Sequence, residues 1–367
     1  MNEIKLTKDL VSIESLNPGG NEVKIFNYVK KILKSNNFKF KEFILEKNHP
    51  NLIIDFSKTN FNKTVFFVGH LDTVPFGKKK WKYDPIKPVI KNNKIFGRGT
   101  TDMKGGVASF ISAVIEMRKF KYTRCNLKAI LVSKEETACE GSNFLAKYLK
   151  YENVSAMVVA EPTDNIPLIG HKGVIWLKLI VDGKTAHGSS PHLGKNSIYK
   201  SLKIIEILKK IKFSDKHQYL GKPTLNIGKF ISGQNINSVP DLAEIYVDIR
   251  TVGKNKYYLE KIKKLLKNKC RYEIIANQEY VYNDKWMEQN NLNILKKISK
   301  YRKIDFKPST AKYFTDGAPL QKVYKKPFTV IVGPGTTKMA HQTDEYLIIS
   351  ELKKSKEMFK DIITHYC

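Results

Sequence analysis

Apolar residues over the first 170 positions follow two different spacings, and each spacing predicts one type of element. Helical spacing predicts helices, and short β-branched or aromatic runs predict buried strands. The predicted helices span residues 3–13, 22–34, 107–117 and 142–149, and the predicted strands span 51–56, 64–68, 89–91, 94–96, 127–132 and 156–160. Strands that alternate with helices predict a mixed, largely parallel sheet covered by helices, which is an α/β fold.

A different order of elements begins near residue 171. Strand 174–181, helix 197–211, strands 224–230 and 243–249, helix 257–266 and strand 272–276 follow one another. This is the order of a split βαβ, or ferredoxin-like, α+β domain. After residue 282 the first pattern resumes, with a helix over 286–301 and strands over 304–306 and 328–332. We therefore expect a sheet domain made of residues 1–170 and 283–367, with a lid domain of residues 171–282 inserted into it.

Composition limits the class of protein. The chain has 367 residues, of which 41% are hydrophobic, so it can form substantial cores. No apolar run reaches the length of a membrane span, and the N-terminus lacks the apolar core of a signal peptide. Cys125, Cys139, Cys270 and Cys367 are scattered and form no CxxC pair. We therefore expect a cytoplasmic protein with reduced thiols and no membrane partner.

The net charge of +30 by itself favours an anionic partner. Lysine supplies most of this charge, and the lysines are spread along the whole chain instead of forming one arm or stripe. A solvated lysine-rich surface explains this pattern, so we expect no nucleic acid as partner. A non-enzymatic nucleic-acid-binding protein is the remote alternative, and it predicts salt-sensitive binding to DNA or RNA.

Candidate chemistry begins directly after the predicted strand 64–68. His70 and Asp72 follow Gly69, where a buried strand delivers polar side chains to the edge of a sheet. Ligand sites in open α/β sheets gather beyond the carboxyl ends of strands. A carboxylate two residues after a histidine can also orient that imidazole toward a metal. A simple hydrogen-bonded pair is the alternative for this motif taken alone.

The same arrangement recurs at the ends of other predicted strands. The side chains concerned are His70, Asp102, Glu135, Glu136, Glu161 and His341. Imidazoles and carboxylates at one edge are the ligands that a pair of zinc ions prefers, with one carboxylate shared between the ions. Each residue has a simpler alternative, such as a helix cap for Asp102, a solvated turn for the two glutamates or a surface loop for His341. The whole set together favours a two-metal site.

The motifs that carry these residues resemble those of a known family. GHLDTVP at 69–75, GRGTTDMKGG at 97–106, KEET at 134–137, AEPT at 160–163 and AHQTDEY at 340–346 occur in the order expected of the co-catalytic zinc aminoacylase and carboxypeptidase family. The resemblance covers nearly the whole chain. Within the family the sequence is most similar to acetylornithine deacetylases, followed by succinyl-diaminopimelate desuccinylases.

The resemblance implies a role for each residue of the set. It implies two Zn²⁺ ions, with Co²⁺ as the alternative metal, Asp72 as the group that orients His70, and Glu135 as the general base. One ion would be held by His70, Asp102 and Glu161, and the other by Asp102, Glu136 and His341. It also implies a cis peptide bond between Asp102 and Met103.

Residues that contact the substrate are also implied by the resemblance. Asn237 and Arg250 match positions that bind the substrate, and His187 matches a lid histidine that reaches the active site of the partner subunit in a homodimer. Asp316 and Gly317 lie in TDGAP at 315–319, a stretch that mixes features of the two subfamilies. Asp316 is a candidate partner for a substrate ammonium group, and a helix N-cap is its alternative role.

These implications together describe a zinc-dependent hydrolase of linear amides. The expected substrate is a small, anionic N-acyl amino acid, with N-acetylornithine hydrolysed to ornithine and acetate in arginine biosynthesis. A succinyl-diaminopimelate desuccinylase or a dipeptidase of the same family is the alternative. The zinc site alone does not separate these activities.

Overall fold

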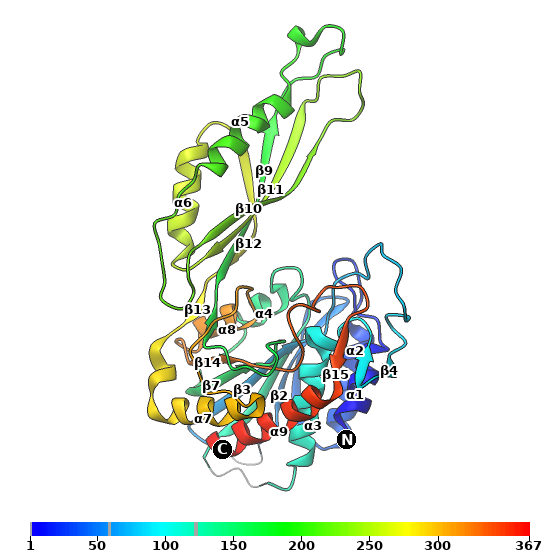
Figure 1. Ribbon diagram of the computed structural model, residues 1–367, viewed down its shortest axis with the longest axis vertical. Coiled ribbons are helices and arrows are strands. Elements are labelled where there is room, and N and C mark those ends of the chain that lie inside the picture. Colours follow the sequence, from blue (N-terminus) through cyan, green and yellow to red (C-terminus); the bar gives the residue numbers. More distant parts are fainter. Residues whose placement is uncertain (1, 58–59, 121–123) are drawn as a thin grey trace. The chain divides into compact units, whose positions relative to one another are not determined.

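The computed structural model describes residues 2–57, 60–120 and 124–367 of the chain. The chain divides into two compact units (Figure 1). The first unit comprises the residues up to Gly170 together with Val281–Ser309 and Thr315–Cys367, and the second comprises His171–Tyr280 and Thr310–Phe314. The two-residue strands β8 (Gly170–His171) and β13 (Val281–Tyr282) lie where the chain passes from one unit to the other.

A six-stranded sheet with the order β1-β2-β6-β3-β7-β14 forms the centre of the first unit. Its strands are β1 (Lys39–Glu46), β2 (His49–Asp55), β3 (Thr64–His70), β6 (Asn126–Val132), β7 (Val154–Val159) and β14 (Phe328–Ile331). β6, β3, β7 and β14 run parallel, whereas β1 and β2 are antiparallel additions at one edge. Every residue of β3 is buried, as expected of a strand covered on both faces. The predicted mixed, largely parallel α/β sheet is confirmed.

Helices pack around this sheet. They are α1 (Glu3–Val11), α2 (Val23–Ser35), α3 (Gly105–Glu116), α4 (Glu140–Leu145), α7 (Gln289–Ser299), α8 (Gly317–Val323) and α9 (Ile349–Tyr366). α3 is buried along almost its whole length, and α1 and α9 both pack against it (Figure 1). α2 and α4 pack against β1 and β2.

A small antiparallel sheet, β15-β5-β4, consists of β15 (Tyr346–Ile348), β5 (Lys94–Phe96) and β4 (Val89–Lys91). The hairpin predicted from Asn92 and Asn93 is confirmed, since both residues have positive φ.

The second unit has the split βαβ order of elements. These are β9 (Gly173–Asp182), α5 (Ser197–Lys209), β10 (Thr224–Ser232), β11 (Leu242–Thr251), α6 (Asn255–Leu266) and β12 (Arg271–Gln278). The antiparallel sheet has the order β10-β11-β9-β12. Alternate residues of β11 are buried in an apolar core that they share with residues of α5 and α6, such as Ile204 and Ile262. The sheet therefore has one face covered by helices.

Several predictions of single elements were wrong. No strand occurs over 304–306, where Ile304 is exposed and the charged Asp305 separates the two apolar residues. The helix expected over 142–149 is α4, which ends at Leu145, and β1 and α9 were not predicted. Among the described residues, no helix has the length and apolar character needed to cross a membrane.

The expectation of reduced cysteines was wrong for one pair. Cys125 and Cys367 form a disulfide whose Cα atoms lie 4.7 Å apart, and Cys139 and Cys270 are free. Cys125 immediately precedes β6 and Cys367 immediately follows α9, so folding brings together residues separated by 242 positions in the sequence. Sequence spacing carries no signal for such a pairing.

Candidate active site

The carboxyl ends of the parallel strands deliver the candidate ligands to one edge of the sheet. His70 is the last residue of β3 and pairs with Val132, the last residue of β6, so Glu135 and Glu136 follow at the same level. Val159 ends β7 and pairs with Ile331, the last residue of β14. Glu161 follows β7, and the loop after β14 leads to His341. The register of the sheet therefore explains why residues far apart in the sequence converge.

Asp72 fixes the orientation of the His70 imidazole. The Nδ1 atom of His70 lies 3.0 Å from the backbone oxygen of Asp72 and 3.5 Å from its Oδ1. Both of these atoms are acceptors, so the proton belongs on Nδ1 and the lone pair on Nε2. Nε2 is buried and has no hydrogen-bond partner, although it lies 3.3 Å from Asp102 Oδ1 and 3.7 Å from Glu161 Oε1. A buried imidazole lone pair facing carboxylates is a poor hydrogen-bonding arrangement and a good metal-binding one.

Asp102 directs its two oxygens toward different histidines. Oδ1 lies near His70 Nε2, whereas Oδ2 lies 3.3 Å from His341 Nε2. His341 Nε2 also lies 3.1 Å from Glu136 Oε2. In a tetrahedral site with metal–ligand bonds of about 2.0–2.1 Å, ligand atoms lie about 3.3 Å apart. The observed separations therefore suit two neighbouring metal ions with Asp102 between them.

The charges of the site also favour a cation. Burial, together with the charge of Asp102, raises the pKa of Glu161 well above its ordinary value and that of Glu136 to about 7. Although burial opposes ionisation of Asp102, the neighbouring imidazoles of His341 and His70 hold its pKa below the usual range. Hydrogen bonds to Asp102 and Glu136 raise the pKa of His341 to about 10. Buried carboxylates that resist ionisation in this way are stabilised by divalent cations. The residues present therefore fit a metal pair.

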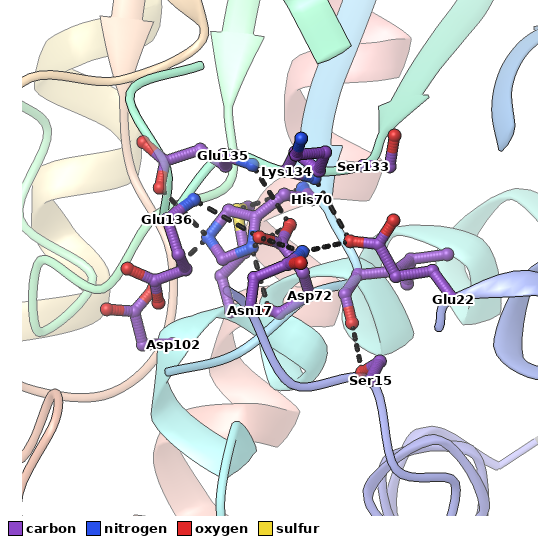
Figure 2. Close-up of polar contacts among 12 residues, drawn as sticks. Ser15, Asn17, Glu22, His70, Asp72, Asp102, Ser133, Lys134, Glu135 and Glu136 are labelled. Atoms are coloured by element: carbon purple, nitrogen blue, oxygen red, sulfur yellow. Dashed lines mark hydrogen bonds and ion pairs between the residues drawn. The ribbon is translucent and has the colours of Figure 1, made fainter. Parts of the chain in front are cut away.

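Glu135 faces the same group of side chains but lies farther from His70 than Asp102 and Glu161 do. Its Oε2 lies 4.0 Å from His70 Nε2, and its Oε1 lies 3.6 Å from the thiol of Cys139. Burial raises the pKa of Glu135 well above its ordinary value, and neighbouring carboxylates such as Asp316 add to this effect. Asp72 accepts hydrogen bonds from the backbone N–H groups of Glu135 and Glu136, each 3.1 Å long (Figure 2). Asp72 therefore orients both His70 and the turn that carries these two glutamates.

Glu345 holds the loop that presents Asp102, and the sequence analysis missed it. One oxygen of Glu345 accepts hydrogen bonds from Thr101 N at 2.8 Å and Asp102 N at 3.2 Å. The other accepts from Arg98 Nη1 at 2.8 Å and Gly99 N at 3.0 Å. Glu345 is fully buried and lies in the same AHQTDEY motif as His341. The Asp102–Met103 peptide is cis, as the family resemblance implied.

Asp316 and Gly317 lie at the start of α8. Asp316 occupies the N-cap position, but its side chain caps no backbone N–H group, so the alternative role as an N-cap was wrong. Its Oδ1 accepts a hydrogen bond from Ser142 Oγ at 2.6 Å, and its Oδ2 is buried without a hydrogen-bond partner. Burial raises the pKa of Asp316 to about 6. The N–H of Gly317 donates to Thr315 Oγ1 at 3.1 Å.

His187, Asn237 and Arg250 belong to the second unit. His187 and Asn237 lie side by side, because Gly188 N donates to the Asn237 backbone oxygen at 2.7 Å and residues 187 and 238 form a β-bridge. Arg250 forms a bidentate pair with Asp248, with Nε–Oδ1 and Nη2–Oδ2 distances of 2.8 and 2.9 Å. Its Nη1 is buried and has no hydrogen-bond partner. Asp248 thus occupies the planar edge of Arg250 and leaves one nitrogen for a ligand.

Imidazoles and carboxylates that converge beyond the parallel strands define a metal-dependent hydrolase site. The sequence profile of peptidase family M20/M25/M40 matches residues 66–365, and the chain belongs to this family. The resemblance described from the motifs and the assignment as a hydrolytic enzyme are therefore confirmed.

The chain is similar over its whole length to named relatives. It is 28% identical over 383 residues to an acetylornithine deacetylase of Buchnera aphidicola, covering 99% of this chain and 98% of the relative. It is also 28% identical over 402 residues to a probable succinyl-diaminopimelate desuccinylase of Staphylococcus epidermidis. This match covers 99% of this chain and 97% of the relative. Its fold matches that of an M20 family metallo-carboxypeptidase from Sulfolobus solfataricus, with a TM-score of 0.84 and 18% sequence identity. The match covers 100% of this chain and 99% of the carboxypeptidase chain.

Proposed function

We propose that this enzyme removes the acyl group from a small N-acyl amino acid, with N-acetylornithine as the preferred substrate. The observation that carries the proposal is the division of Asp102 between His70 and His341. This arrangement supports a shared carboxylate between two zinc ions, one held with His70 and Glu161 and the other with Glu136 and His341. Cobalt is the alternative metal. A similar structure from Bacillus subtilis is described as a dinuclear metal-binding peptidase of the M20 family.

In this proposal, bound zinc supplies a water of lowered pKa and polarises the acyl carbonyl. Glu135 acts as the general base, which accepts the proton of the attacking water and transfers it to the departing amine. Its position beside the cluster, 4.0 Å from His70 Nε2, supports this role. Asp72 holds His70 in the required tautomer and also fixes the backbone of Glu135.

His187 is the proposed donor to the oxyanion that forms on the acyl group. Ser189 N–H donates to His187 Nδ1 at 3.2 Å, which leaves the proton on Nε2. An N–H group of this kind can stabilise developing negative charge. We propose that His187 acts across a homodimer formed by the second unit. Exposed apolar side chains on α5 and the edge strand β10 support this, and they are Tyr199, Leu202, Phe230 and Ile231.

The proposed substrate carries a carboxylate and a terminal amine. The free Nη1 of Arg250 and the side chain of the exposed Asn237 are the candidate donors to the carboxylate. The unpartnered Oδ2 of Asp316 is the candidate acceptor for the amine of ornithine. A second candidate is succinyl-diaminopimelate, favoured by the desuccinylase among the relatives and by the net charge of +30, which suits a more anionic substrate.

The experiment that tests this proposal compares kcat/KM for N-acetylornithine, N-succinyl-diaminopimelate and simple dipeptides with zinc-loaded protein. We expect N-acetylornithine to be preferred, and Asp316→Asn to lower its kcat/KM through KM because the substrate amine loses a charged partner. A preference for the succinylated substrate would reject the assignment of N-acetylornithine. No turnover of any of these amides would reject deacylation altogether.

A further inference from the structure

We propose that Glu22 is a positioning residue that fixes the turn carrying Glu135 and Glu136. The inference rests on the proposed function, in which one glutamate acts as the base and its neighbour binds metal. Glu22 lies outside the motifs that carry the resemblance. Its side-chain contacts are to Asn17, His49 and the Lys134 N–H, and not to the candidate ligands. These ligands, which we call the metal-binding cluster, are His70, Asp102, Glu136, Glu161 and His341. Glu22 acts through the backbone of the turn and through Asn17.

The turn after β6 is held by side chains along its whole backbone. Ser133 N donates to Asn51 Oδ1 at 3.0 Å, and Lys134 N donates to Glu22 Oε1 at 3.0 Å. The next two N–H groups, those of Glu135 and Glu136, donate to the carboxylate of Asp72. Four successive N–H groups therefore point toward side-chain oxygens. Such a series of N–H groups forms a binding site for anions, and here the protein supplies its own acceptors.

Lys134 needs an external restraint because its backbone is unfavourable. Its φ is 54°, in the left-handed region that residues with a Cβ atom rarely adopt. Conformations of this kind persist where surrounding contacts determine them. The hydrogen bond from Lys134 N to Glu22 is made at this residue, immediately before the two glutamates. Glu22 therefore restrains the backbone of Lys134, the residue after which the chain leads into Glu135 and Glu136.

Two buried side chains, Asn17 and His49, hold Glu22 itself. Asn17 Nδ2 donates both to Glu22 Oε1 and to Asp72 Oδ2, so one amide connects the two carboxyl groups (Figure 2). The other oxygen of Glu22 lies 3.0 Å from His49 Nδ1 at the start of β2. Glu22, Asn17 and His49 are all buried. These residues form a layer behind Asp72, which we call the Glu22 network and which consists of Asn17, Glu22 and His49.

Two substitutions of Glu22 distinguish loss of the Glu22 network from a change of residue that preserves it. Burial, together with the charge of Asp72, raises the pKa of Glu22 to about 8, and burial lowers the pKa of His49. A neutral carboxyl group of Glu22 donates to Nδ1 of a neutral His49 and accepts from Lys134 N and Asn17. Glutamine has the same donor and acceptor on the same skeleton. Glu22→Gln should therefore preserve the network, whereas Glu22→Ala should break it.

The test measures zinc affinity of metal-free protein by competition with a chromophoric chelator, and kcat and KM with N-acetylornithine. We expect Glu22→Ala to lose 10–100-fold in zinc affinity, the usual effect of losing a residue behind a metal ligand, and to lose kcat with little change in KM. Glu22→Gln should stay within about 3-fold of the parent, as expected if it preserves the network. Glu42→Ala is the matched control, because Glu42 lies on the neighbouring strand β1 and forms a partly buried ion pair with Lys30, away from the turn.

Each outcome decides the proposal. Parental zinc affinity and kcat in Glu22→Ala, with only a lower Tm, would show a purely structural role and would overturn it. If Glu22→Ala does not fold, Asn17→Ala removes the amide that joins Glu22 to Asp72, and the same loss of zinc affinity is expected. The zinc measurement does not depend on the substrate, so it tests Glu22 even if N-acetylornithine is the wrong substrate.

Discussion

The most informative single perturbation outside the metal-binding cluster is Glu345→Gln. The Glu345 carboxylate accepts four N–H groups, two at each oxygen, and pairs with the buried guanidinium of Arg98. Glutamine retains one oxygen, so its NH₂ group must face either Arg98 and Gly99 or Thr101 and Asp102. In both cases the NH₂ group of glutamine faces two N–H donors and cannot accept a hydrogen bond from either. The substitution therefore removes two hydrogen bonds and the countercharge of Arg98.

The size of the effect follows from these contacts. Hydrogen bonds that involve a charged group contribute about 1.5–3 kcal/mol each, and breaking a buried ion pair costs about 3–5 kcal/mol. If the NH₂ group faces Arg98, the two losses overlap at that residue. If it faces Thr101 and Asp102, the Arg98 hydrogen bond is kept. In either case we expect a decrease of about 3–5 kcal/mol in the free energy of unfolding. Burial raises the pKa of Glu345, although Arg98 opposes this, so the lower end of the range is favoured.

The assay is urea unfolding of the metal-free protein followed by tryptophan fluorescence, together with zinc titration of the folded variant. The control Glu42→Gln disrupts an ion pair that is only partly buried and should change the free energy of unfolding by at most about 1 kcal/mol. We expect Glu345→Gln to weaken zinc binding as well, because the N–H of Asp102 loses its acceptor. Stability within about 1 kcal/mol of the parent, or destabilisation with unchanged zinc affinity, would refute the view that Glu345 positions Asp102.

Three further predictions concern the cluster and the second unit. Zinc should raise the Tm of metal-free protein in a concentration-dependent way, because it binds the folded cluster and relieves repulsion among Asp102, Glu136 and Glu161; a zinc-independent Tm in a thermal shift assay would disagree with the proposed ligands. Glu135→Gln should keep zinc but lower kcat about 10²–10⁴-fold, as expected for loss of a general base; loss of zinc, measured by metal analysis, would instead make Glu135 a ligand. Mixing inactive His187→Ala with inactive Glu135→Gln should restore part of the activity through mixed dimers, whereas no recovery after subunit exchange would argue against action across the dimer.

The sequence predicted the residues whose signal is local. His70 ends the apolar strand β3 and Glu161 follows shortly after the apolar strand β7, so each strand pattern and its polar residue are visible together. The parallel order of β6, β3, β7 and β14 then brings these ends together without further information. For this reason the fold class and the grouping of the metal-site residues at one edge were predictable.

Residues that act through a distant partner were not predictable. Glu345 binds the N–H of Asp102 across 243 positions, and Glu22 binds that of Lys134 across 112. Nothing near Glu22 in the sequence distinguishes it from a solvated carboxylate. Glu345 lies in the AHQTDEY motif, but the motif does not reveal which N–H groups it binds; its burial and its contacts in the folded chain do. The planar edge of Arg250 is likewise occupied by Asp248, a contact that its motif alone does not reveal.

Some elements were missed although a signal existed. α9 has apolar residues at helical spacing, including Leu352, Phe359 and Ile363, but lysines separate them and lower the mean hydropathy. β1 is an edge strand whose residues are all partly or fully exposed, so it lacks the buried face that produces a clear alternation. Surface charge in this lysine-rich chain therefore obscures amphipathic patterns more than it obscures buried strands.

The central claim is that Asp102 is shared by two metal ions. The most direct measurement is the zinc content per chain, determined by mass spectrometry after zinc reconstitution and removal of free metal, for the parent and for Asp102→Ala. The account predicts two zinc ions per chain in the parent and the loss of both in Asp102→Ala. A parent that holds at most one zinc ion, or an Asp102→Ala variant that still holds two, would contradict it.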